Sequence, residues 1–429
     1  MTRRSPPSAL ALILCLGGLA RADGDPARGA PPGADTGSVG SAVPTWHEAV
    51  EPIIQRRCQA CHREGQAAPF ALQTREQAAE WADTIAEVVR ERRMPPWHAD
   101  PAIGRFANDR HLDDAEQATI LAWLAGGLPA GDPGKATPAP SWPESGWHIG
   151  QPDAVISMPR SVKIPATGVL QYQYFDVGTD FGEDKWVDAL EVRVGAPAVV
   201  HHVLIFIKFP DNSQPNMKGG LKGYFASGLP GDSVLPFPPG LAKRLPRGSR
   251  LIFQMHYTPN GTAAEDRTEL GLRFAPSGAT RREMRTTSVF ETDFRIPPHA
   301  AGHEVTAETR FKEDTILYSF LPHMHVRGKS FKYVLRTPDG KEEVLLSVPR
   351  YDFNWQSSYR LAEPRFLPAG SRVTGYAVYD NSEQNPANPD PSRDVGFGEQ
   401  TWDEMMIGYM DVTTATPEER AAWEAAGKK

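Results

Sequence analysis

The sequence predicts a small all-α domain followed by two all-β sandwich domains, and three observations support this fold class. Residues 45–130 carry helix-start patterns and apolar residues at helical spacing. Residues 150–415 carry short alternating apolar and polar stretches between Pro- and Gly-rich turns. The chain of 429 residues is too long for one compact core, and the β stretch is long for one sandwich. We therefore expect two sandwiches that divide near residue 283.

The composition changes along the chain predict seven segments. We expect a signal peptide at 1–22, a disordered leader at 23–44, a helical domain at 45–130, a Pro-rich linker at 131–149, a first β domain at 150–283, a second β domain at 284–415 and a helix-prone tail at 416–429.

The first residues have the pattern of a secretory signal peptide. Two arginines precede an apolar run from Ala9 to Leu19, and a small-x-small cleavage site ends at Ala22. The run is too short to span a bilayer, and no other segment is apolar enough to do so. A lipoprotein anchor at Cys15 is the alternative, but Leu14 stands where that signal needs a small residue. We expect an exported protein, periplasmic or secreted, without stable membrane insertion.

The charge of the chain narrows the choice of partners. The formal net charge is −7, which argues against binding to nucleic acid or to an anionic membrane surface. It is compatible with a basic redox partner.

Helix starts define the predicted helical domain. Thr74-x-x-Gln77 resembles a capping box, and Asp113-x-x-Glu116 begins a second helix that ends near Gly126.

One short motif in the helical region predicts a cofactor. Cys58-Gln59-Ala60-Cys61-His62 is the pattern of c-type haem attachment, in which two thiols add to the haem and the adjacent imidazole binds the iron. Zinc would need two further ligands, and a redox CxxC would need a βαβ context. We therefore predict one covalently bound haem c and a domain that resembles the class I cytochromes c.

Two residues downstream are candidates for the second axial ligand. Met94 and His98 lie in the segment Met94-Pro95-Pro96-Trp97-His98. We favour Met94, because small class I cytochromes resemble this layout and place a methionine before prolines.

Histidines gather in three places in the β region. His201 and His202 are adjacent, His256 lies on the more polar side of its strand, and His323 and His325 are two apart, so that both face one side of a strand. Adjacent strand residues point to opposite faces. His201 and His202 could therefore share a metal only through a bulge, a strand end or different ring nitrogens. A single histidine of this kind is usually structural, so the argument depends on the combination.

Methionines follow near the end of the β region. Met405, Met406 and Met410 offer thioether sulfur, and imidazole with thioether is a soft ligand set that suits copper. The alternative is that they fill a core.

The order of these motifs, HH, HY, HxH and EM, resembles the copper type II, ascorbate-dependent monooxygenases over residues 150–415. The peptidylglycine α-hydroxylating and dopamine β-monooxygenases belong to this family. The resemblance implies two jelly-roll-like domains that each hold one copper across a solvent-filled cleft. It assigns the electron-transfer copper to His201, His202 and His256.

The resemblance also assigns the catalytic copper, where O₂ is activated to hydroxylate a C–H bond, to His323, His325 and Met405. Met405 is preferred because Glu404-Met405 matches the family's motif, and Tyr409 matches a tyrosine that contacts substrate.

Two departures from the family pattern concern the substrate. Leu321 replaces the arginine that holds a peptide carboxylate, and Ile407 replaces an asparagine. We therefore expect a different small organic substrate.

The leading hypothesis is a monooxygenase that uses O₂ and two copper ions, with the haem as an electron relay from a periplasmic donor. The alternative is a non-catalytic periplasmic protein that binds copper or transfers electrons. Imidazole must be neutral to bind metal, so we expect copper loss as the pH falls through roughly 6 to 5.

Overall fold

The computed structural model describes residues 42–143, 146–210, 223–278 and 281–426. The predicted signal peptide and nearly all of the predicted leader lie outside these residues. From Val43 onward the chain forms one compact unit. Within the described ranges, no helix is long and apolar enough to cross a membrane.

Helices are short, and three of them begin with the reciprocal side-chain caps that their sequences encode. Thr74, Asp113 and Thr416 each accept a hydrogen bond from the backbone N–H three residues later, where a Gln or Glu side chain returns the bond. The helical elements are η1 (Trp46–Val50), α1 (Glu51–Arg57), α2 (Arg75–Glu80), α3 (Ala82–Arg90), α4 (Asp114–Ala125), η2 (Pro133–Lys135), η4 (Phe353–Trp355) and α5 (Pro417–Ala425).

The first sheet pair encloses one hydrophobic core. Apolar residues alternate along its strands and interdigitate between the two sheets, as Val192, Val203 and Phe253 do. One sheet contains β1 (Ala154–Ser157), β11 (Glu269–Phe274), β4 (Lys185–Arg193), β8 (Leu241–Leu245) and β12 (Arg282–Glu283), with β7 (Val234–Pro236) paired to β4. The other contains β3 (Gln173–Gly178), β9 (Arg250–Tyr257), β5 (Val200–Lys208) and β6 (Tyr224–Gly228), and a small ribbon joins β10 (Ala264–Asp266) to β2 (Val162–Ile164).

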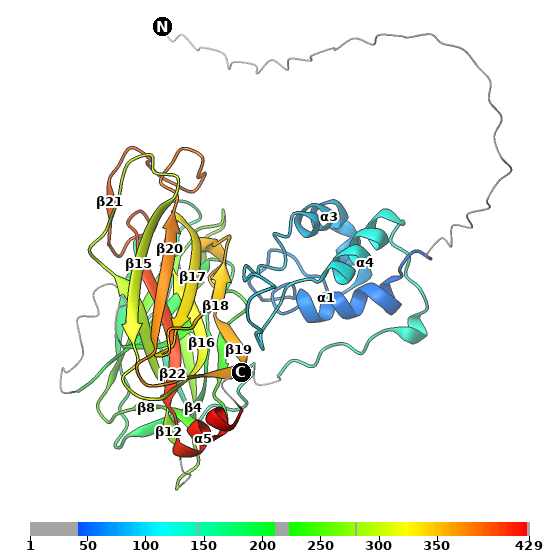
Figure 1. The fold of residues 1–429 in the computed structure, drawn as a ribbon. Coiled ribbons are helices and arrows are strands. Elements are labelled where there is room, and N and C mark those ends of the chain that lie inside the picture. The colour runs from blue at the N-terminus through cyan, green and yellow to red at the C-terminus, as the bar shows by residue number, and fades with distance from the viewer. Residues whose placement is uncertain (1–41, 144–145, 211–222, 279–280, 427–429) are drawn as a thin grey trace, which may run out of the picture. The chain divides into compact units, whose positions relative to one another are not determined.

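The second sheet pair begins after Glu283 and encloses its own core, with Phe331, Tyr333 and Met406 inside. One sheet contains β13 (Arg285–Glu291), β22 (Met406–Thr414), β16 (Thr315–His323) and β19 (Tyr359–Leu367). The other contains β15 (His303–Arg310), β20 (Arg372–Tyr379), β17 (Gly328–Arg336) and β18 (Glu342–Val348), which lie side by side in Figure 1, and a ribbon joins β14 (Arg295–Ile296) to β21 (Val395–Gly396).

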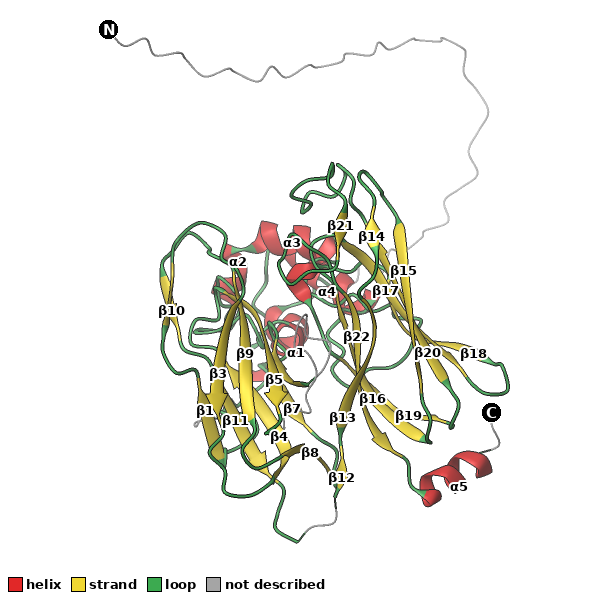
Figure 2. Ribbon diagram, turned by 90° about the vertical axis from the view of Figure 1, so that its left-hand side faces the viewer, coloured by secondary structure: helices red, strands yellow, loops and turns green. Residues whose placement is uncertain are grey.

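The outer faces of two sheets meet where the first and second sheet pairs touch. Tyr224 of β6 and Leu229 after it pack against Leu321 of β16 and against Ile407 and Tyr409 of β22. Figure 2 shows β3, β9 and β5 in one sheet and β13, β22 and β16 in the other. The candidate site lies on these two outer faces.

The predicted fold class is wrong in its first part. The chain is mostly β, with 37% strand and 15% helix, and the described residues form no clear all-α cytochrome c domain. Trp97 and Phe106, which follow the first three α-helices, belong to the core of the second sheet pair rather than to a helical core. Phe106 also pairs with Leu361 through a backbone bridge. The prediction failed because helical periodicity reveals which segments are helical, but not where the apolar residues between helices are buried.

Candidate metal centre

A bulge in β5 brings the imidazole rings of His201 and His202 next to each other. The register between β5 and β9 shifts between Val200 and His202, which makes His201 the extra residue of the bulge and pairs His202 with His256. Of the three arrangements that the sequence left open, the structure thus shows the bulge. His202 and His256 share the outer face of their sheet with Leu204 and Ile252, while their neighbours Val203 and Met255 fill the inner core.

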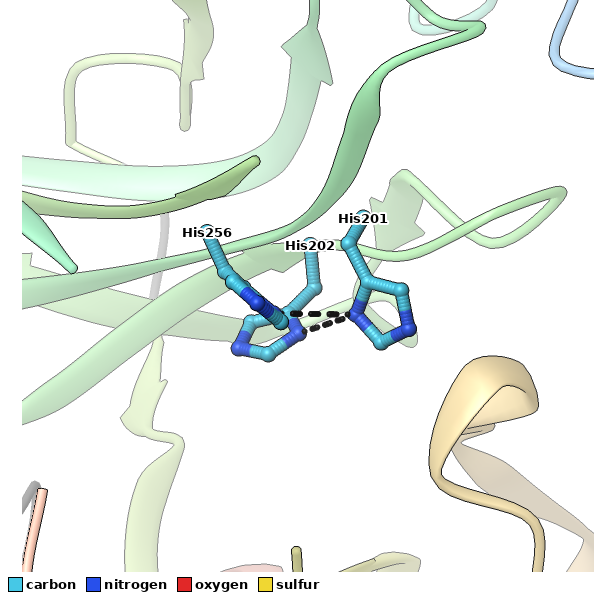
Figure 3. A group of neighbouring side chains, drawn as sticks. All are labelled: His201, His202 and His256. Carbon is cyan, nitrogen blue, oxygen red and sulfur yellow. Dashed lines mark hydrogen bonds between the residues drawn. The ribbon is translucent and has the colours of Figure 1, made fainter. Parts of the chain in front are cut away.

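The three histidines of this first set, His201, His202 and His256, turn their rings toward one another (Figure 3). Nδ1 of His201 lies 3.0 Å from Nδ1 of His202 and 3.2 Å from Nδ1 of His256. A neutral imidazole carries one N–H, so these three nitrogens cannot all be satisfied by hydrogen bonds to one another. Three lone pairs at this separation suit one metal ion bound by about 2 Å bonds.

The second set consists of His323, His325 and Met405. His323 ends β16, and His325 lies just beyond the strand, so the expectation that both histidines lie within one strand is only half right. Alternation nevertheless holds: Met324 points into the core of the second sheet pair, and the rings of His323 and His325 lie 5.3 Å apart between centroids.

Hydrogen bonds at Nδ1 leave Nε2 as the nitrogen with which each histidine of this second set can bind a metal. Nδ1 of His323 lies 2.8 Å from Oε1 of Gln356, and Nδ1 of His325 lies 3.2 Å from the carbonyl oxygen of Asp403. Because both partners accept, Nδ1 carries the proton and Nε2 keeps its lone pair. Nε2 of His325 is buried without a protein partner among the described residues, which suits a metal ligand.

The methionines divide between the two faces of β22. Just before β22, Met405 packs with Leu321, Ile407 and Tyr409 on the outer face, and the residue before it, Glu404, accepts a hydrogen bond from the backbone N–H of His325. Met406 and Met410 fill the core of the second sheet pair. The site residue Tyr409 is buried and stacks on Tyr224, with ring centroids 4.8 Å apart.

A buried carboxyl group holds the loop that carries His325. Glu404 accepts hydrogen bonds from the backbone N–H of His325 at 2.8 Å and of Arg327 at 2.6 Å. Burial raises the pKa of Glu404 to about 8, although these donors and the Arg327 guanidinium oppose the shift.

The two histidine sets are in contact. The rings of His202 and His323 lie 6.1 Å apart between centroids, and Gln356 lies between them, with its amide nitrogen 3.5 Å from Nδ1 of His202. The ring of Phe353 stacks on that of His201, and the ring centroids of Tyr172 and His256 lie 4.7 Å apart. The resemblance implied a solvent-filled cleft between two coppers. Here side chains from the loops occupy that space, and all five histidines form one cluster.

Burial keeps the imidazoles of the cluster neutral. Loss of solvation lowers the pKa of His201 and His323 to about 4 and that of His325 to about 3. The pKa values of His202 and His256 also fall, to about 2 for His256, because burial is reinforced by the neighbouring imidazoles. Neutral imidazole is the form that binds metal.

The haem motif follows α1 as a tight turn, in which His62 N–H donates to the carbonyl of Cys58 at 2.9 Å. A largely apolar cavity of about 220 Å³ is lined by Cys58, Cys61, His62 and Met94. Nδ1 of His62 lies 3.1 Å from the carbonyl oxygen of Phe70, which leaves Nε2 for iron. His98 does not line this cavity, and it borders a separate pocket with Arg350. The residues therefore fit a haem with Met94 on its second side.

Three residues of this centre escaped the sequence reasoning. Tyr172 belongs to an alternating stretch just before β3, Phe353 lies in η4 and Gln356 follows it, and all three reach the histidines only through the fold. Their residue types carry no metal signal, so only the structure could reveal them.

No protein-family model and no curated protein matches the chain. Solved structures give weak likenesses. The major capsid protein P2 of bacteriophage PM2 matches with 8% identity and a TM-score of 0.26, covering 61% of this chain and 97% of that one. The STIV MCP matches with 8% identity and a TM-score of 0.28, covering 62% and 98%. At such scores these likenesses support no conclusion about this chain.

Proposed function

We propose that the chain is an exported copper-dependent monooxygenase that hydroxylates a C–H bond of a small organic substrate with O₂. Its electrons come from a periplasmic donor through a c-type haem attached to the same chain. The observation that carries the proposal is the buried cluster in which His201, His202 and His256 of the first sheet pair meet His323 and His325 of the second.

Each histidine set has a defined way to hold a copper ion. Nδ1 atoms converge in the first set, whereas the histidines of the second set offer Nε2 atoms and would be joined by the thioether of Met405, the residue after Glu404. A thioether favours Cu(I) and so distinguishes the second set from the first. Bound copper would supply the activation of O₂. Glu404 positions the His325 loop, and Gln356 fixes the tautomer of His323.

The cavity beside α1 would hold the haem. Cys58 and Cys61 would form its thioether links, while His62 and Met94 would bind the iron. A thioether ligand would raise the reduction potential of the iron relative to a second imidazole.

A second candidate function is electron transfer or copper binding without hydroxylation. It is favoured by the burial of His323 and His325, which are 3% and 0% exposed, because a substrate must reach these ligands through a movement of the surrounding loops.

Oxygen uptake by the exported, metal-loaded protein separates the two candidates. With a chemical reductant and a panel of small aliphatic and aromatic compounds, we expect at least one compound to stimulate uptake and to gain an oxygen atom from labelled O₂. Met405→Leu should lower that uptake by about 100-fold or more, because the Cu(I) ligand is lost.

The matched control is Met410→Leu, which changes a core methionine of β22, the strand that begins directly after Met405. It should leave uptake within about twofold. Full loading with iron and copper but no compound that stimulates uptake would favour the second candidate.

A further inference from the structure

A single segment of the chain touches both the haem cavity and the histidine cluster. We infer that residues 353–357, the connecting segment, carry electrons from the haem to the copper centre. In this assignment Trp355 is the group on the haem side, and Gln356 is the group that contacts both histidine sets. The inference rests on the proposed function for its two cofactors, but it concerns only the path between them.

On the haem side, Trp355 lines the cavity together with Cys58, Cys61 and His62, although it lies almost three hundred residues further along the chain. Arg110 lines the same cavity and donates a hydrogen bond of 3.2 Å to the hydroxyl of Ser357. The indole ring of Trp355 is thus the aromatic group that the second sheet pair contributes to this cavity.

On the copper side, the next residue bridges the two histidine sets. Gln356 contacts His323 at 2.8 Å through its oxygen and His202 at 3.5 Å through its nitrogen. Phe353 stacks on the ring of His201 with centroids 4.8 Å apart. Trp355 and Gln356 are covalently adjacent, so a path from cavity to cluster needs no step through solvent.

Hydrogen bonds of the two residues that flank the segment, Asp352 and Ser358, fix its position. Asp352 caps η4 by accepting from the N–H of Asn354 at 2.9 Å. Asn108 donates to the carbonyl of Ser358 at 2.9 Å, and the Ser358 hydroxyl donates to Asp232 of the first sheet pair. A segment held in this way keeps the distance between the two cofactors constant, as electron transfer requires.

The proposed step is the transfer of one electron and involves no bond or proton. A ferrous haem becomes ferric, and a cupric ion held by the histidines becomes cuprous. The periplasmic donor then restores the ferrous haem by giving one electron.

Anaerobic stopped-flow absorbance of the full chain, loaded with haem and copper, tests the path. The haem is reduced, and its reoxidation by bound Cu(II) is followed without O₂ or substrate. Trp355→Leu should slow this reoxidation by about tenfold or more, while the iron content, copper content and copper EPR signal stay as in the wild type.

The matched control is Trp81→Leu. Trp81 stacks on Phe70, which contacts His62, so the control removes an indole near the haem ligand but outside the connecting segment. It should leave the rate within about twofold of the wild type. Gln356→Met is a second test variant with a similar expected slowing, because Met has a similar length but lacks the amide whose oxygen accepts from His323 and whose nitrogen faces His202.

Wild-type rates in both Trp355→Leu and Gln356→Met would overturn the inference, and so would equal slowing in Trp81→Leu. If one of the two test variants loses haem or copper, the rate measured in the other variant decides the question. If both variants lose a cofactor, the connecting segment supports the cofactor sites and the inferred electron path is overturned. Failure of the proposed function has a different signature. In that case haem reoxidation by copper is normal, but no compound stimulates oxygen uptake.

Discussion

At the scale of single residues, burial determines the chemistry of the histidine cluster. The pKa values of all five imidazoles lie below the ordinary 6.5, and the main cause is loss of solvation. The copper loss that the sequence alone places at roughly pH 6 to 5 should therefore shift to lower pH, because protons compete less well for these nitrogens.

The metal-free protein should lose stability in acid. Below pH 6.5 the unfolded chain binds protons at these histidines and the native chain does not, so the free energy of unfolding falls as the pH falls. The loss should run from about pH 6.5 to about pH 4 for His201 and His323, and it should continue to lower pH because His325, His202 and His256 have lower pKa values in the folded state. Urea unfolding of the metal-free protein across this range measures it, and a flat profile would contradict the burial of these rings.

Glu404→Gln should damage the Met405 side of the centre. Both carboxyl oxygens accept backbone N–H groups, and the amide of Gln would place an N–H₂ against one of those donors. We expect a loss of about 2 kcal/mol in unfolding free energy and weaker binding of one copper, measured by urea unfolding and metal analysis.

Glu343→Gln is the control for this substitution, because Glu343 forms an exposed ion pair with Arg365. Such pairs contribute about 0 to 1 kcal/mol, so both readouts should hardly change. Equal effects in the two variants would refute the role of Glu404.

The candidate ligands were predictable because their motifs are specific in combination, whereas the residues that support them were not. His201, His202, His256, His323 and His325 gather as the motifs predict. Gln356 and Phe353 reach the site through tertiary contacts, which a local pattern does not contain.

At the scale of elements, alternation predicted the strand faces well. His256 lies opposite the core face of β9, and the bulge that adjacent histidines require is present in β5. The end of β16 at His323 was not predictable. There the chain turns so that the N–H of Gly328 bonds to the carbonyl of His325, and Glu404 holds the turn.

A buried lysine joins elements of the two sheet pairs. Lys243 of β8 donates to the carbonyl of Phe225 at 2.8 Å and to Thr286 of β13 at 3.0 Å, and it lies 3.5 Å from Asp411 of β22. Lys243→Met should lower the unfolding free energy by about 3 kcal/mol, because it leaves a buried charge without its partner.

Thermal unfolding measures this loss, and copper content should stay unchanged because Lys243 contacts none of the proposed ligands. Lys341→Met, in an exposed pair with Asp339, is the control and should cost less than about 1 kcal/mol. A stability loss no larger than in the control would contradict the role of Lys243.

At the scale of the whole molecule, the loop that follows α3 joins the core of the second sheet pair, whereas the helices enclose a separate core of their own. Trp97 and Phe106 both pack edge-on against Tyr359 of β19, with centroids 4.9 and 5.6 Å apart. Helix positions were predictable from their caps, but this packing of the loop was not, because the residues lie outside any periodic segment.

Thermal unfolding should therefore show one transition. Haem absorbance, which reports on the helical stretch, and far-ultraviolet circular dichroism, which reports on the sheets, should give coincident curves. Trp97→Ala should move both curves together, with a loss of about 3 to 5 kcal/mol. Two separate transitions would mean that the haem-bearing stretch folds independently.

The central claim is that one chain holds a haem and two coppers, and metal analysis tests it most directly. Protein matured with haem, exported and reconstituted with copper should contain one iron and two coppers per chain. His323→Ala combined with His325→Ala should leave one iron and one copper. One iron with no copper in the wild-type protein, or with zinc in its place, would contradict the account.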